Sequence, residues 1–176
     1  HSVTVAALAK GVARAMGLEE DMIQTAETAG RLMNIGKILI PENVLSAENL
    51  KDSDRKKIRE SIMASADFLK EIEFQGPVVE TIRQSQEKVD GSGMLGLKGE
   101  AILLPARIIA ACNALVAMVS ERAYRQRKPL SDALKTLLED ADTTYDRRVC
   151  AALVHFVENG DGKEILADSL KGLAVA

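Results

Sequence analysis

Residues 102–120 read ILLPARIIAACNALVAMVS, the longest strongly apolar stretch of the chain. Pro105, Arg107 and Asn113 interrupt it, whereas a membrane-spanning helix needs about 20 predominantly apolar residues with few charges. We therefore predict a long helix that is buried inside a folded domain and is not inserted into a membrane.

Helical periodicity continues on both sides of this stretch. Apolar residues recur three and four positions apart, and acidic, glycine or proline residues mark the ends of the segments. The expected helices run from the first residues to 16, from 19 to 35, over 52–70, 77–88 and 102–120, onward from 131, and over 145–158. Residues 90–99 contain four glycines and are expected to form a shaped loop. The pattern predicts an all-α fold of about seven helices with no significant sheet.

Composition excludes several classes of protein. The 176 residues suit a single domain over 1–176, with a tail or short helix over 160–176. A net charge of −3 excludes a global positive field for a nucleic acid polymer. Cys112 and Cys150 lie outside any zinc-binding or disulfide spacing, and no secretory signal opens the chain, so we expect a cytoplasmic protein with reduced thiols.

Several short segments with distinctive residues follow one another in a fixed order along the chain. They are HSVTVA (1–6), MNIGKI (33–38), EKVDGSGMLGLKGE (87–100), ARII (106–109) and SERAYR (120–125). Their order and separation resemble the bacterial HD-GYP family, a branch of the HD metal-dependent phosphohydrolases that includes cyclic di-GMP phosphodiesterases. The resemblance covers nearly the whole chain and implies an HD-domain-like helical bundle. Met94-Leu95 replaces the Tyr-Pro of the family's signature loop.

The resemblance also implies a cluster of divalent iron or manganese, held by histidine and aspartate side chains. At the corresponding positions this chain has neutral or thioether side chains, namely Met33, Asn34, Ser61, Ser85, Gln86 and Asn113. His1 is retained, and Glu87 is a neighbouring carboxylate, so an improvised metal site of His1, Asn34 and Glu87 is the alternative to a metal-free domain. We expect no catalytic residues, no metal and no cofactor, since one histidine does not hold a catalytic cluster.

The resemblance implies that certain basic residues face the phosphates of a cyclic dinucleotide ligand, and this chain retains basic residues at those positions. They correspond to Lys37, Arg122 and Arg125, and such cations bind a phosphodiester without metal. We therefore predict a catalytically inactive signalling module that binds a cyclic dinucleotide or a partner such as a diguanylate cyclase, and that is part of a longer protein with an upstream receiver or sensor domain. The alternative is a weakly active, iron- or manganese-dependent cyclic di-GMP phosphodiesterase.

Overall fold

The computed structural model describes residues 1–45, 47, 51–120 and 127–171, with side chains up to residue 168. Across these residues the chain is helical, and its only β-type pairing is an isolated bridge between Ala141 and Tyr145. The all-α prediction is therefore confirmed. The elements are α1 (Ser2–Ala15), α2 (Glu20–Leu32), η1 (Ile35–Leu39), α3 (Glu42–Leu45), α4 (Asp52–Leu69), α5 (Val78–Gln84), η2 (Gly99–Ala101), α6 (Leu104–Val119), α7 (Leu130–Glu139), α8 (Arg147–Asn159) and α9 (Gly162–Lys171).

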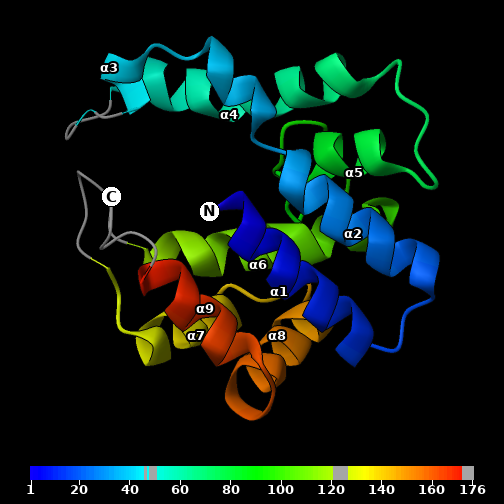
Figure 1. Ribbon diagram of the computed structural model, residues 1–176, viewed down its shortest axis with the longest axis vertical. Helices are drawn as coiled ribbons and strands as arrows, with labels where there is room; N and C mark the ends of the chain where they lie inside the picture. Colours follow the sequence, from blue (N-terminus) through cyan, green and yellow to red (C-terminus); the bar gives the residue numbers. More distant parts are fainter. Residues whose placement is uncertain (46, 48–50, 121–126, 172–176) are drawn as a thin grey trace.

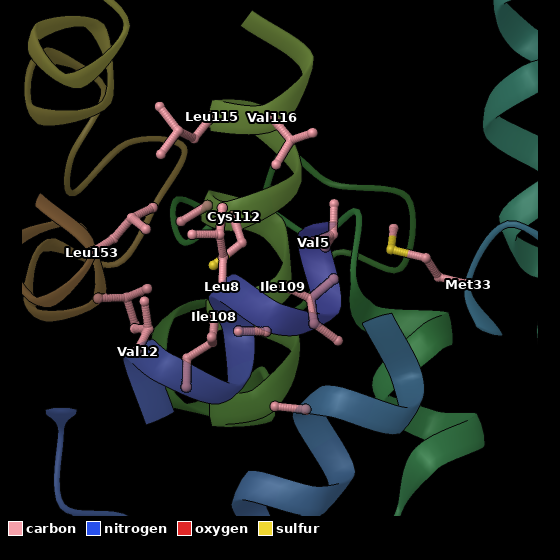
Figure 2. Packing of buried hydrophobic residues seen from close by; sticks show 14 of the residues in the cluster. Val5, Leu8, Val12, Met33, Ile108, Ile109, Cys112, Leu115, Val116 and Leu153 are labelled. Carbon is pink, nitrogen blue, oxygen red and sulfur yellow. The ribbon is translucent and has the colours of Figure 1, made fainter. Parts of the chain in front are cut away.

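Helix α6, which corresponds to the apolar stretch over residues 102–120, is the centre of the bundle. It packs against α1, α2, α5, α7 and α8, and Figure 1 shows α1 crossing it while α4 lies on one side of the molecule and α7–α9 lie on the other. The apolar side chains of α6 are almost all buried because neighbours surround it on several faces. In Figure 2, Ile108, Ile109 and Cys112 of α6 meet Val5 and Leu8 of α1 in the core.

The short η1 helix joins α2 to α4 through a close backbone approach. The Gly36 N–H donates to Ser65 Oγ at 2.8 Å, and the Ser65 hydroxyl lies 2.8 Å from the Met33 carbonyl, to which it donates. A Cβ atom on Gly36 would lie only 2.0 Å from the Ser61 carbonyl oxygen, so only glycine allows η1 to contact α4 this closely. This contact fixes the end of α2 and the start of η1 relative to α4.

Helix α5 is shorter than its apolar pattern predicts. We expected it to reach residue 88, but it ends at Gln84. The reason is that the following backbone pairs elsewhere, since Val89 and Asp90 donate their N–H groups to the Thr144 and Thr143 carbonyls. Residues 85–90 therefore leave the helix and run beside the segment that precedes α8.

Both cysteines lie in the interior of the bundle. Cys112 and Cys150 are both buried, and within the described residues neither forms a disulfide. Burial raises the pKa of the Cys112 thiol, and it raises the pKa of the Cys150 thiol to about 12. Both thiols therefore stay protonated at neutral pH. Among the helices that the structure describes, none has the length and apolar character needed to cross a membrane.

Candidate functional site

A cavity of about 350 Å³ opens where five segments of the chain converge. Its walls come from the start of α1, from η1, from α4, from the residues after α5, and from α6, with Thr144 and Tyr145 completing them. Of the residues predicted from the sequence, the structure brings seven together here: His1, Asn34, Lys37, Ser85, Gln86, Glu87 and Asn113. Arg122 and Arg125 lie outside the described residues.

Met33 does not line the cavity. Its side chain is fully buried in the hydrophobic core, and Figure 2 shows the thioether extending toward Val5 of α1. Asn34, the next residue, lines the cavity instead, because α2 ends at Leu32 and the chain turns into η1. At position 33 the side chain thus fills core volume, which suits the flexible thioether of methionine.

The serine hydroxyls at two predicted positions are used by their own helical turns. Ser61 Oγ donates to the Ile58 carbonyl at 2.7 Å, and Ser85 Oγ donates to the Ile82 carbonyl at 2.8 Å. Both serines are almost completely buried, and Ser61 is not among the residues that line the cavity. Each hydroxyl therefore satisfies a local backbone carbonyl.

Four polar side chains near the start of α1 form two hydrogen bonds. His1 Nε2 lies 2.8 Å from Asn113 Oδ1, which identifies His1 Nε2–H as the donor and the amide oxygen as the acceptor. Asn34 Nδ2 donates to Ser2 Oγ at 2.9 Å. These contacts join α1 to α6 and to η1 through neutral amides, in a place where the resemblance implies carboxylates.

Among the residues that the structure describes, Glu87 is the one carboxylate that lines the cavity, and it holds the glycine-rich loop. Its Oε1 and Oε2 accept from the Leu95 and Leu97 N–H groups, each at 2.8 Å, and the residue is only 4% exposed. Gly93 makes room for it, since a Cβ there would lie 2.6 Å from Oε1. Both carboxylate oxygens are thus occupied by backbone donors, which gives Glu87 a structural task.

Glu87→Gln should loosen this loop without unfolding the bundle. An amide keeps only one acceptor oxygen, so one of the two bonds is lost and the –NH₂ group faces a backbone N–H. We expect the free energy of local opening to fall by about 1–2 kcal/mol, seen as roughly tenfold faster NMR amide exchange at Leu95 and Leu97. Glu100→Gln, at an exposed carboxylate beyond the loop, is the matched control; equal exchange in the two variants would contradict the assignment.

Arg59 and Lys88 also line the cavity, and sequence reasoning missed both. Arg59 lies beside the apolar stripe of α4, next to Ile58, and Lys88 directly follows Glu87. Spacing gives a weak signal for Arg59, because residues 59 and 62 share a helix face and residue 62 is an apolar isoleucine. With Lys37 they place three cations in the described part of the wall, against the single carboxylate of Glu87.

Tyr145 also lines the cavity, and its phenol is partly buried. Burial raises the pKa of this phenol, and the nearby Asp140 carboxylate raises it further. The hydroxyl is therefore a neutral hydrogen-bonding group at physiological pH.

The donor set does not fit a cluster of divalent metal ions. Among residues 1–45, 47, 51–120 and 127–171, no three His, Cys, Asp or Glu side chains are grouped to hold a metal. The cavity offers one imidazole, one carboxylate already bound to two N–H groups, and neutral amides. Hard divalent ions need ionised oxygen ligands or several imidazoles, and the described donor set does not provide them.

The chain is similar to known proteins over most of its length. A sequence model described as "HD domain" matches residues 1–149. A cyclic di-GMP phosphodiesterase of Pseudomonas aeruginosa is 31% identical over 160 residues, covering 89% of this chain and 38% of that protein. A 3'3'-cGAMP-specific phosphodiesterase of Vibrio cholerae is 32% identical over 139 residues, covering 78% of this chain and 32% of that protein. The chain thus spans well under half the length of these relatives.

A solved structure is similar over most of the chain. It is a protein of Bdellovibrio bacteriovorus described as HDG"Y"P, with a TM-score of 0.74 and 20% sequence identity, covering 90% of this chain and 52% of that one. At this identity the likeness establishes the fold alone.

Proposed function

Because the chain belongs to the HD domain family, as the sequence resemblance predicted, we propose that it is a non-catalytic member that binds a cyclic dinucleotide in the cavity between η1, α4 and α6. The observation that carries the proposal is the chemistry of the cavity wall. Neutral side chains occupy the positions that the resemblance assigns to metal ligands, and the carboxylate of Glu87 is used by the loop. The cavity retains cations suited to phosphate.

Lys37 is the first of these cations, and it lines the cavity from η1. Its position is set by Gly36, whose close contact with α4 leaves η1 little freedom. By the resemblance, Arg122 and Arg125 join Lys37 on the phosphates. Arginine forks and a lysine ammonium bind phosphate oxygens through charge-assisted hydrogen bonds. In a longer signalling protein, such a module reports ligand binding to a neighbouring domain.

The names of the matched relatives favour a second candidate function, hydrolysis of a cyclic dinucleotide. The resemblance to the HD-GYP family implies that this reaction would use iron or manganese, here in a reduced complement. In that case His1 and Asn34 hold the metal, together with Glu87 only after it releases the loop. The names of these relatives favour phosphodiesterase activity, whereas the side chains that line the cavity of this chain favour ligand binding without hydrolysis.

Metal analysis combined with a hydrolysis assay separates the two functions. We expect substoichiometric iron and manganese in the purified protein, and no linear product from cyclic di-GMP after incubation with added Fe²⁺ or Mn²⁺. The Pseudomonas relative, assayed in parallel, serves as the positive control. Stoichiometric metal with turnover would establish the phosphodiesterase and end the non-catalytic proposal.

Docking of a signalling protein is tested by the same samples. Met94 and Leu95 are 49% and 44% exposed on the loop that Glu87 holds, and a diguanylate cyclase is the partner type that the resemblance implies. If calorimetry detects no binding of cyclic di-GMP, or binding that Arg122→Ala with Arg125→Ala leaves unchanged, docking through this loop becomes the better account.

A further inference from the structure

The cavity differs in charge from the rest of the chain. The whole chain has a formal net charge of −3, yet the described part of the chain lines the cavity with three cationic side chains and one carboxylate. The carboxylate, Glu87, directs both oxygens to the loop backbone. Positive charge therefore collects where a metal cluster would otherwise supply it, and the low dielectric of the walls strengthens its field.

Two of the three cations come from segments that are joined at the cavity. Gln86 Nε2 donates to the Arg59 carbonyl at 3.1 Å, which ties the residues after α5 to α4. Lys88 lies two residues beyond Gln86, so Arg59 and Lys88 line neighbouring parts of the wall. Both side chains are exposed, and no ion pair joins either of them to a residue that the structure describes. Hydrogen bonds from Ser92 hold the pKa of the fully exposed Asp90 carboxyl below its ordinary value, and the nearby charge of Lys88 contributes to this lowering. Each cation is thus available to an anionic ligand.

We infer that Arg59 and Lys88 bind a phosphodiester of the ligand directly and take over the electrostatic task of metal ions. The inference rests on the proposed function and adds two binding residues to Lys37. A guanidinium binds two phosphate oxygens at once, while an ammonium acts as a point charge. Such cations neutralise the phosphate but generate no hydroxide nucleophile, so the ligand is retained intact.

Calorimetry in the presence of EDTA tests the inference, with cyclic di-GMP and 3'3'-cGAMP as separate probes. Wild-type protein should bind at least one of them without metal. Arg59→Ala combined with Lys88→Ala should weaken binding by about a hundredfold, since each charge-assisted bond accounts for roughly a factor of ten. The affinity of the wild type should also fall more steeply with added salt than that of the variant.

Arg55→Ala combined with Lys98→Ala is the matched control, because it removes one exposed arginine of α4 and one exposed lysine of the loop, both outside the cavity. This control should bind within about twofold of wild type. Circular dichroism of both variants checks that the helices are retained.

Each other outcome has a definite meaning. Wild-type binding in EDTA that the cavity variant and the control reduce equally would overturn the inference and leave the proposed function standing. Binding that appears only with Mn²⁺ would overturn the inference and support the phosphodiesterase. No binding of either dinucleotide with or without metal would overturn the proposed function itself.

Discussion

Replacing Asp146 with alanine should lower the free energy of unfolding by about 3–5 kcal/mol, as expected when one partner of a buried ion pair is removed. Asp146 Oδ2 lies 2.5 Å from Arg107 Nη1, and the two side chains are only 10% and 9% exposed. Arg107 Nε has no hydrogen-bond partner among the described residues, so Asp146 is the main compensation for a buried guanidinium on the central helix. Urea denaturation followed by circular dichroism measures the loss.

Two further variants divide this loss into its causes. Asp146 also caps α8, because Oδ1 accepts from the Arg148 N–H at 2.8 Å and from the Val149 N–H at 3.4 Å. Asp146→Asn keeps a capping oxygen and should therefore be less destabilising than alanine by about 1 kcal/mol. Asp142→Asn, which breaks an exposed ion pair with Arg147, should cost less than about 1 kcal/mol. A loss for Asp146→Ala no larger than that for Asp142→Asn would refute the buried-pair account.

The same pair has a defined pH dependence. Burial alone would raise the pKa of Asp146, but hydrogen bonds from Arg107 and from two backbone N–H groups, together with the Arg107 charge, hold it below the ordinary value. The stabilisation is therefore complete above the unfolded-state pKa of about 3.9 and is lost as the pH falls through the lower folded-state pKa. The stability difference between wild type and Asp146→Asn should be constant from pH 7 to pH 5 and should shrink below about pH 4.

The sequence predicts the helices better than their ends. The apolar pattern over 102–120 predicts α6 to within two residues at its start and one at its end, because apolar spacing and burial agree there. It fails for α5, which stops at Gln84 because Val89 and Asp90 form backbone hydrogen bonds with Thr143 and Thr144. Contacts between residues more than 50 positions apart leave no periodic trace in a single sequence.

At the candidate site, too, the sequence predicts which segments meet better than it predicts how individual side chains are used. Residues that a motif marks, such as Asn34 and Lys37, are found at one cavity, since the motif segments converge in the fold. Met33 continues the apolar spacing of α2 and is buried in the core as that spacing indicates, whereas the entry of Asn34 into the cavity depends on where α2 gives way to η1. Nor does the sequence show that Glu87 binds the Leu95 and Leu97 N–H groups, which depends on the shape of the loop.

Introducing two carboxylates into the cavity should create a metal site. Asn34 and Asn113 line the same cavity, and His1 Nε2 lies 2.8 Å from Asn113 Oδ1. Asn34→Asp with Asn113→Asp adds two ionised oxygen ligands beside an imidazole, a set suited to Mn²⁺. We expect Mn²⁺ to bind roughly a hundredfold more tightly than to wild type, measured by the loss of the free Mn²⁺ electron paramagnetic resonance signal.

Asn43→Asp with Asn159→Asp is the matched control, since it adds the same charge at two exposed positions outside the cavity. It should leave Mn²⁺ affinity near that of wild type, and equal gains in both variants would show that only general charge is responsible. The cavity variant should also bind cyclic di-GMP more weakly in EDTA, because carboxylates oppose the field of Arg59 and Lys88. The affinity for Mn²⁺ and the metal-free affinity for cyclic di-GMP should therefore change in opposite directions. This is expected if the ligand phosphates can be neutralised either by cationic side chains or by metal ions.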